Sequence, residues 1–356
     1  MLNPLAVDIS MVNIPAVTGS FGSFSGGVAS GSTFGWGEVG IITLTPQIAD
    51  GDYLGAGNII GTTTTNVGRF IPDHFAISSA TLTAACSSST PFTYFNQDGF
   101  TTAFTITAQN AMNGTTQNYD GAFANLDLTN YAKYGFSAAT LPTGSGLSSS
   151  VVPPSGSWNN GVAAVSVKHQ ISRPTALTAE TPITVSAAPN DGEVPVSSAT
   201  SLGGATKLRY GRLKMQNAYG SELLNLPIML EAQYWNGLAY VRNQSDSCTT
   251  VPATSISMSN YFKNLSACET QIGFLSGTGT FTNGVSKYLR LSKPGAGNHG
   301  SVDLTVDTNS ASGKTCATSS ELNATSANVP WFGVTPASRA TFGIFKTPII
   351  YIRENF

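Results

Sequence analysis

Charge is scarce in this sequence. Its 17 lysines and arginines and 19 aspartates and glutamates make up only 10% of the 356 residues, against about 25% in ordinary soluble domains. The formal net charge is -2, and apart from the short run 207–214 the chain has no concentration of lysines and arginines, with which proteins bind a phosphate backbone. Nucleic acid is therefore not an expected partner.

Long apolar runs are missing as well. No stretch approaches the ~18 unbroken apolar residues that cross the hydrocarbon layer, so we expect no membrane span. Residues 1–17 lack a basic start followed by an apolar run, so they do not form a secretory signal, and we interpret Met1 as the start of a fragment. Hydrophobic residues still make up 41% of the chain, which is enough to bury a core and argues against disorder.

Histidine is also rare, which limits the catalytic chemistry. The chain has His74, His169 and His299, and a Ser-His-Asp triad needs one of them beside a nucleophile. The run His299-Gly300-Ser301-Val302-Asp303 is typical of a glycine-rich turn that leads into a strand. The GxSxG elbow is absent, because Gly22-Ser23-Phe24-Ser25-Gly26 has phenylalanine at the nucleophile position. We expect none of the three histidines to be catalytic and the protein not to be an enzyme.

The carboxylates and the one basic run have structural interpretations. Asp303 and Asp307 alternate on one strand, as on a solvated face, although paired carboxylates of a glycosidase are harder to exclude than a triad. The turn Asp50-Gly51-Asp52 offers oxygens to calcium but lacks the glutamate of an EF-hand loop, so we expect a plain turn. The basic run 207–214 is interpreted as a polar strand face with a bulge at Gly211. No metal and no cofactor is expected.

The four cysteines form an even set in a chain rich in Thr, Ser, Asn and Gly, as in proteins outside the cytoplasm. We expect two disulfides, and four buried free thiols are the alternative. Zinc is disfavoured because no CxxC or paired histidine is present. Of the three possible pairings we favour Cys248 with Cys268, which closes a local loop, and Cys86 with Cys316.

Alternation of apolar and polar residues at period two predicts antiparallel strands. It occurs at 104–109, at 302–307 and at 228–235, where Asn236-Gly237 follows as a strong hairpin signal, so we expect a hairpin at 228–243. No window shows a capped helical stripe. The chain is therefore predicted to be all-β.

Proline- and glycine-rich stretches divide the chain. They predict a Gly/Ser/Phe-rich N-terminal β extension at 1–72, an Ig-like β-sandwich at 73–197 and a second β-sandwich at 198–356, the two sandwiches being antiparallel and packed together. At the end of the chain we expect 349–353 to be a buried strand with Ile350 and Ile352 facing the core. Deleting the last eight residues should then unfold the C-terminal unit.

Several stretches resemble one known family. They are Phe34–Gly40, Tyr53–Gly57, Val67–Phe75, Asn118–Ala124, Leu208–Leu213, Gln216–Glu222, Leu230–Gly237, Asp246–Thr249, Pro330–Trp331, Arg339–Gly343 and Ile349–Glu354. Together they are similar to the C-terminal region of the MSHA biogenesis protein MshQ and its bacterial relatives, a domain of unassigned function encoded with type IV pili. The resemblance implies a bacterial protein, extracellular or on the surface of a Gram-negative cell, and supplies no site residues.

The leading hypothesis is a non-catalytic, pilus-associated structural or adhesive surface protein whose partners are pilus or other surface proteins. The first alternative is a carbohydrate-binding or carbohydrate-active module, in which Trp158, Trp235 or Trp331 stacks on sugar rings. The second alternative is a self-associating extracellular fibre subunit that uses strand complementation.

Overall fold

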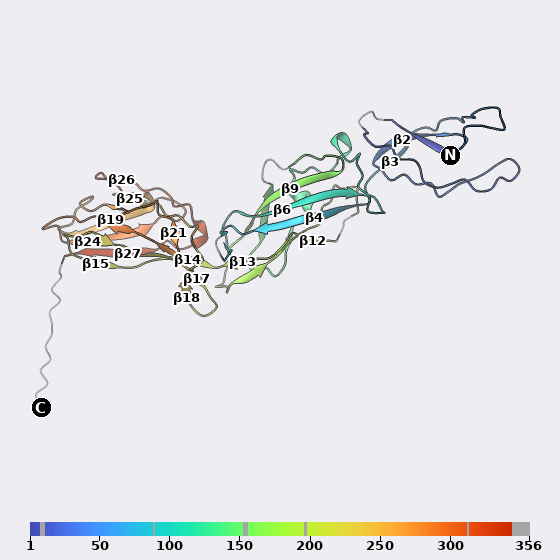
Figure 1. Ribbon diagram of the computed structural model, residues 1–356. Coiled ribbons are helices and arrows are strands. Elements are labelled where there is room, and N and C mark those ends of the chain that lie inside the picture. Colours follow the sequence, from blue (N-terminus) through green and yellow to red (C-terminus); the bar gives the residue numbers. More distant parts are fainter. Residues whose placement is uncertain (8–10, 88–89, 152–155, 196–197, 312, 344–356) are drawn as a thin grey trace, which may run out of the picture.

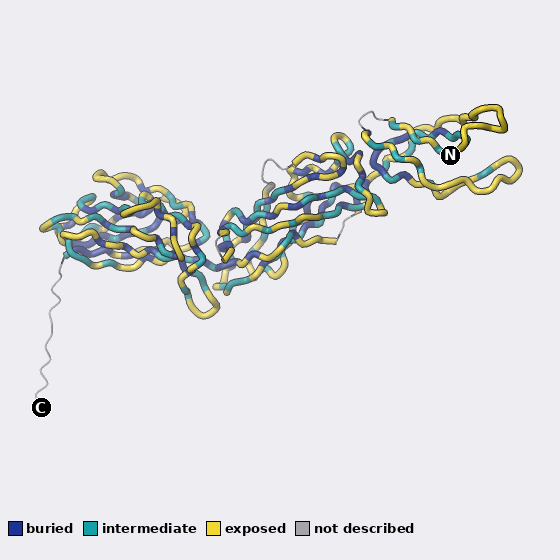
Figure 2. Tube along the Cα trace, viewed as in Figure 1, coloured by how far each residue is buried: buried dark blue, intermediate teal, exposed yellow. Residues whose placement is uncertain are grey.

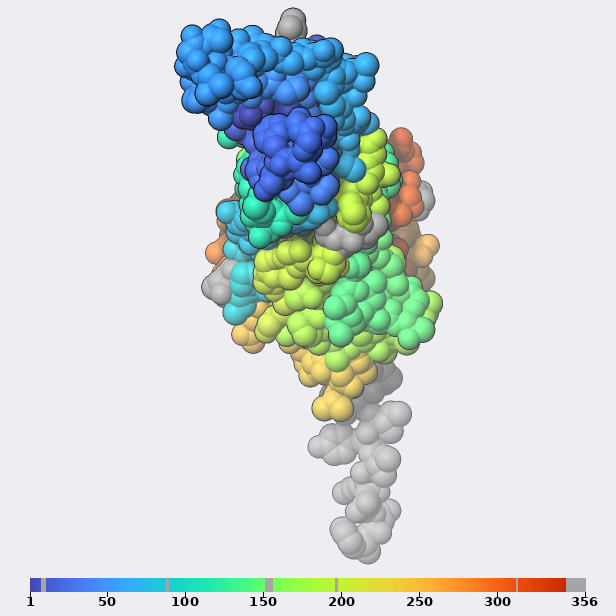
Figure 3. Space-filling view, turned by 90° about the vertical axis from the view of Figure 1, so that its right-hand side faces the viewer, coloured from blue at the N-terminus to red at the C-terminus, as the bar shows by residue number. Residues whose placement is uncertain are grey.

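The computed structural model describes residues 1–7, 11–87, 90–151, 156–195, 198–311 and 313–343. These residues form three β units in a row along an elongated molecule (Figure 1). Seen from the N-terminal end, the C-terminal unit lies mostly behind the other two (Figure 3). The helical turns in the described parts are short 3-10 segments, so the all-β expectation is confirmed. No helix there is long and apolar enough to span a membrane.

The N-terminal unit is a small antiparallel sheet in the order β1-β2-β3. Its strands are β1 (Leu2–Ala6), β2 (Gly40–Pro46) and β3 (Val67–Phe70). Among its described residues, the buried core cluster consists of Met11, Trp36 and Ile42, with half-buried apolar neighbours. Gly40 has a positive φ of 138°, and a Cβ there would collide with Sδ of Met11, so this position requires glycine.

The middle unit places a four-stranded antiparallel sheet against two three-stranded sheets. The first contains β4 (His74–Thr83), β6 (Phe100–Gln109), β9 (Val162–Ile171) and β8 (Leu147–Val151), in that order. The others are β10 (Thr181–Ile183), β13 (Thr206–Arg209) and β5 (Thr93–Tyr94), and β12 (Thr200–Ser201), β11 (Val185–Ala187) and β7 (Ser137–Ala138). Phe104, Ile106 and Ala108 of β6 are buried, as their alternation predicts.

The C-terminal unit is a sandwich around the largest core. One sheet has β15 (Ala218–Gly220), β27 (Ala337–Phe342), β24 (Gly300–Val306) and β19 (Ile256–Lys263). The opposite side has β14 (Gly211–Met215), β17 (Leu230–Trp235), β22 (Val285–Ser286) and β21 (Phe281–Thr282), with β18 (Tyr240–Arg242) on β17, and also β16 (Leu226–Pro227), β23 (Leu289–Leu291) and β20 (Ile272–Phe274). The expected hairpin forms from β17 and β18.

The smaller elements lie in the connections. A two-stranded sheet is formed by β25 (Lys314–Thr315) and β26 (Leu322–Asn323), and the 3-10 turns are η1 (Gly121–Phe123), η2 (Tyr131–Tyr134), η3 (Ala253–Ser255) and η4 (Pro330–Phe332). Buried positions lie inside each unit, and exposed ones concentrate in the loops (Figure 2). The strand expected at 349–353 lies outside the described residues.

The passage from the middle to the C-terminal unit lies at β13 and β14. β13 pairs with β10 and β5, and Leu202 and Leu208 are buried in the core of the middle unit. β14 begins at Gly211 and belongs to the C-terminal sandwich. Residues 198–209, which the sequence analysis placed with the C-terminal unit, therefore pack with the middle unit, because the core decides the boundary and the glycine-rich linker does not.

Candidate functional site at the joint between the middle and C-terminal units

The joint begins with a segment that belongs to both units. β5 pairs in parallel with β13 of the middle unit. Yet Phe92 and Tyr94 are fully buried in the core cluster of the C-terminal unit, and the Tyr94 ring lies 4.8 Å from that of Phe332. The middle unit thus contributes side chains to its neighbour's core, and bending the joint would expose them to water.

A disulfide crosses the same joint. Cys86 is bonded to Cys248, with a Cα–Cα distance of 5.8 Å and a sequence separation of 162. Cys268 is bonded to Cys316 inside the C-terminal unit, with a separation of 48. Two disulfides are confirmed, but the pairing that we favoured is wrong. We had favoured the pair closest in sequence. Cys86 instead forms a β-bridge with Phe92, next to β5, and this segment packs into the core of the C-terminal unit.

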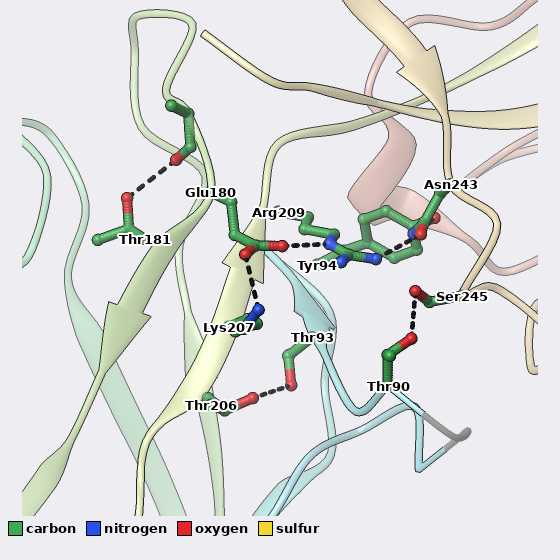
Figure 4. A network of polar contacts seen from close by, with 11 residues as sticks. Thr90, Thr93, Tyr94, Glu180, Thr181, Thr206, Lys207, Arg209, Asn243 and Ser245 are labelled. Carbon is green, nitrogen blue, oxygen red and sulfur yellow. Dashed lines mark hydrogen bonds and ion pairs between the residues drawn. The ribbon is translucent and has the colours of Figure 1, made fainter.

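Arg209, the last residue of β13, is buried at the centre of the joint (Figure 4). Its Nε donates to Oε2 of Glu180 at 2.7 Å, and its Nη1 donates to Oδ1 of Asn243. The guanidinium also lies over the rings of Phe92 and Tyr234, at 4.7 and 4.5 Å. The interpretation of this basic run as a solvated strand face is therefore wrong for Arg209, although Lys207 and Lys214 are exposed.

Glu180 balances the charge of Arg209. Burial by itself raises the pKa of Glu180, but the hydrogen bond and charge of Arg209, together with Lys207, bring it below its ordinary value. Lys207 lies 3.2 Å from the carboxylate. The buried cation is thus paired, as a charge inside a protein must be.

Asp246 is the second buried charge of the joint, and it is fully buried. Its carboxylate accepts from the Tyr94 hydroxyl at 2.8 Å, and from the Thr249 hydroxyl and amide at 2.7 and 2.9 Å. Asn243 Nδ2 donates to the Tyr94 oxygen at 2.7 Å. Burial, and then the charge of Asp246, raise the pKa of Tyr94 well above its usual range, so the hydroxyl stays protonated and keeps donating.

Further contacts surround these buried groups. Thr90 donates to the Ser245 hydroxyl across the joint, and Thr93 shares a hydrogen bond with Thr206 (Figure 4). The guanidinium of Arg173 lies 3.7 Å over the Tyr210 ring and donates to the carbonyl oxygens of Gly211 and Trp331. Side chains from both units therefore fix the joint on several sides.

The three tryptophans do not form one ligand platform. Trp158 is buried in the middle unit, where its Nε1 donates to the Leu126 carbonyl and its ring lies 4.8 Å from that of Tyr119. Trp158 as a sugar-stacking residue is therefore wrong, because the core takes it. Trp235 is half-buried beside the Tyr240 ring, and Trp331 packs partly on the C-terminal core. Sugar binding at these two stays a prediction.

The histidines have separate environments. His169 is buried, with Nε2 against the Thr102 hydroxyl at 2.8 Å and Nδ1 against that of Ser149 at 2.7 Å. Burial lowers the pKa of His169 to about 4, so it stays neutral. A hydroxyl thus occupies the place that a carboxylate takes in a triad. His74 contacts Asp73 and Gln109, and His299 is exposed.

The candidate carboxylates also have protein partners. Asp52 accepts from the amides of Gly55 and Gly57, as a turn residue does. Asp303 forms an ion pair with Arg339 at 2.7 Å. Asp307 is buried and accepts from the Ser257 hydroxyl at 2.6 Å, so its expected place on a solvated face is wrong. The two aspartates therefore do not flank one open site.

Two family models match this chain. The model of the DUF6701 third domain matches residues 38–210, and that of the DUF6701 fourth domain matches residues 209–355. The chain belongs to the DUF6701 family. The two DUF6701 domains meet at 209–210, which is where Arg209 ends β13 and the joint begins. A search of curated proteins finds no match, and the link to MshQ stays a prediction.

Sequence reasoning missed the polar part of this DUF6701 joint. Tyr94, Asn243 and Asp246 give no periodic signal, since each follows from contacts between segments about 150 residues apart. One sign was present: Asp246 stands two residues before Cys248, so a cysteine expected in a disulfide has an acid beside it. That spacing alone is too short a motif to identify a joint.

Proposed function

We propose that this DUF6701 pair is a rigid, non-catalytic structural segment of an extracellular surface protein, used in a pilus-associated or adhesive assembly. The observation that carries the proposal is the joint, in which a disulfide, a shared aromatic core and two buried charges link neighbouring units. Neighbouring domains usually move relative to one another unless their interface is large and apolar. Two disulfides also fit an oxidising compartment.

The disulfides also decide how tension would pass along the chain. When the two ends are pulled, force reaching Cys86 crosses directly to Cys248, and the 162-residue interval between them is shielded. At about 3.4 Å per extended residue, that interval holds roughly 550 Å of chain that cannot be released. A surface protein that must keep its length under shear benefits from this arrangement.

Single-molecule pulling between the two termini tests the mechanical part of the proposal. The oxidised chain should extend without releasing the interval between Cys86 and Cys248. Reduction should add roughly 550 Å from this interval and roughly 160 Å more from the 48 residues between Cys268 and Cys316. The double change Cys86→Ser with Cys248→Ser should add only the roughly 550 Å, because it keeps the disulfide between Cys268 and Cys316. Release of the full length from the oxidised chain would contradict the proposal.

The biological part needs cells that display the protein. Cells with the Cys86→Ser and Cys248→Ser protein should lose attachment under flow more than in static culture, at equal surface amounts. Attachment under flow that is insensitive to this change would contradict a load-bearing role. Turnover of a polysaccharide or ester that His74→Ala or Asp303→Asn abolishes, with the fold preserved, would favour the enzymatic alternative.

A further inference from the structure

A pocket of about 430 Å³ lies beside the joint, and its size is in the range of small-molecule sites in proteins, about 300–1,000 Å³. Its lining includes β14, Tyr240 at the start of β18, residues 334–337 and Arg173 of the middle unit. Figure 1 shows β14 and β18 at the end of the C-terminal unit that faces the middle unit. Both units therefore contribute side chains to this pocket.

Positive charge is concentrated in the lining. Arg173, Arg212 and Lys214 line the pocket, and among the described residues its lining contains no aspartate or glutamate. None of these three cations forms an ion pair with a described residue. The whole chain has a net charge of -2, so the pocket is a local concentration of positive charge, and such a concentration attracts anions.

Stacking on aromatic rings holds the two arginines in place. The guanidinium of Arg212 lies 3.8 Å from the centre of the Tyr240 ring, in the same way as Arg173 lies over Tyr210. Nε of Arg212 donates to Oε1 of Gln233 at 2.9 Å, and its two terminal nitrogens donate to no described residue. A planar guanidinium with free terminal N–H groups matches the two oxygens of a carboxylate. Arg212 is therefore preorganised to bind one.

Glu231 lies on the same face of the sheet but outside the pocket lining. It pairs in register with Lys214, and no ion pair joins the two side chains. Oε1 of Glu231 accepts from Nε2 of Gln233 at 2.9 Å, while the oxygen of the same amide accepts from Arg212. Gln233 thus stands between the carboxylate and the guanidinium, so Arg212 keeps its charge available for a ligand.

A hydroxyl and aromatic rings lie next to these charges. Burial raises the pKa of Tyr240 and Tyr210 raises it further, whereas the charges of Arg173 and Arg212 act in the opposite direction. The Tyr240 hydroxyl therefore stays protonated at neutral pH and can donate a hydrogen bond. The Trp235 ring lies 5.4 Å from the Tyr240 ring. Aromatic rings offer an apolar surface on which a sugar ring can pack.

We propose that this pocket binds a carboxylated sugar of an acidic polysaccharide, with the carboxylate on Arg212 and the sugar ring beside Tyr240 and Trp235. Lys214 adds attraction at longer range. An acidic peptide would add to a strand edge through its backbone, but at the start of β14 the Gly211 carbonyl already accepts from Arg173. The inference goes beyond the structural role, because binding in this pocket does not depend on whether the chain bears load.

Calorimetric titration of the full chain with tetragalacturonate tests the pocket. The oligosaccharide should bind at one site per chain, and high salt should weaken the binding. Methyl-esterified tetragalacturonate keeps the rings but loses the charges, so it should bind at least roughly tenfold more weakly. Equal binding of the two, or no binding of the acid at millimolar concentration, overturns the proposal. Tighter binding of tetraglutamate also overturns it, since the ligand is then an acidic peptide.

Variants then place the binding in this pocket. Arg212→Gln should weaken it at least roughly tenfold, and Arg212→Lys, which keeps the charge but loses the planar fork, should restore only part of the affinity. The matched control is Arg290→Gln, at another half-buried arginine of a C-terminal strand that lies outside this lining, and it should bind like the unchanged chain. Equal losses in Arg212→Gln and Arg290→Gln overturn the proposal, because binding then reflects only the overall charge.

Lys214→Gln changes an exposed side chain, so it does not put the fold at risk. It should weaken binding of tetragalacturonate roughly two- to fivefold, as expected for an exposed charge. Unchanged affinity in this variant overturns the proposal. Thermal melting of each variant without ligand, compared with that of the unchanged chain, separates a loss of binding from a loss of fold.

Discussion

The molecule has two joints, the first between the N-terminal and middle units and the second between the middle and C-terminal units. Each contains a buried carboxylate that accepts hydrogen bonds across the joint, and their other contacts differ. At the first, Glu38 is buried and its carboxylate accepts from Asn13 Nδ2 and from the amides of Gln117 and Asn118, at 2.8, 2.9 and 3.0 Å. At the second, Asp246 has the same role, but a disulfide and a shared aromatic core accompany it. Buried carboxylates orient both joints, and only the second is also crossed by a disulfide.

This difference predicts an order of failure. The first joint is held by hydrogen bonds, a small apolar cluster and the exposed ion pair between Arg69 and Glu193. Hydrogen bonds to a charged group contribute about 1.5–3 kcal/mol each. Under denaturant or force, the N-terminal unit should therefore detach before the middle and C-terminal units separate.

Removing the disulfide at the second joint should have the largest effect. In the chain-entropy model, a loop of 162 residues contributes roughly 5 kcal/mol to the free energy of unfolding, and one of 48 residues contributes roughly 4 kcal/mol. Cys86→Ser with Cys248→Ser should also make the joint sensitive to limited proteolysis. Cys268→Ser with Cys316→Ser is the control, and it should destabilise the C-terminal unit while the joint stays protected.

The second-largest effect is expected from acid, which should destabilise the middle unit. The buried His169 has a folded pKa of about 4 against an ordinary value of 6.5, so folding favours its neutral form. Its stabilising contribution is complete above pH 6.5 and is lost as the pH falls from 6.5 to 4, a change of about 3 kcal/mol. Unfolding followed by denaturant at several pH values measures this loss.

The control for the acid effect is a matched histidine change. His169→Gln should flatten the pH dependence of the middle unit between pH 6.5 and 4, whereas the exposed His299→Gln should leave it unchanged. Equal acid sensitivity in the wild type and in the His169→Gln variant would mean that other groups cause the effect.

A smaller effect is expected at the first joint. Glu38→Ala leaves the amides of Gln117 and Asn118 without their acceptor, which should cost about 2 kcal/mol and release the N-terminal unit. Hydrogen exchange should rise at 117–118 and leave the second joint unchanged. Glu38→Gln, which keeps one acceptor oxygen, should cost less. Equal exchange in all three proteins would show that Glu38 does not hold the joint.

The smallest effect is expected for the surface ion pair of the first joint. Arg69 and Glu193 lie 2.6 Å apart, with 40% and 33% of their side chains exposed. Glu193→Gln should lower the free energy of unfolding by no more than about 0.5 kcal/mol, and the difference should disappear in high salt. A larger, salt-resistant loss would make this pair a principal contact of the joint.

Local patterns predicted much of the fold. Alternation at 104–109 and the Asn236-Gly237 turn after β17 were sufficient, because strand faces and tight turns depend on neighbouring residues. The candidate site was harder to predict. From the sequence, Trp158 was expected to stack on a ligand and Arg209 to lie on a polar strand face. Both are buried, because burial depends on which distant segment packs over them.

The sequence by itself determined the β class, the presence of two disulfides among the four cysteines and the scarcity of charge. These depend on composition and on periodicity over a few residues. The tertiary structure decided the disulfide partners, the position of the boundary at Arg209 and the joint itself. The joint, its boundary and the disulfide between Cys86 and Cys248 require β5 to lie between two units, which is a contact between residues about 150 positions apart, and no local pattern encodes such a distance.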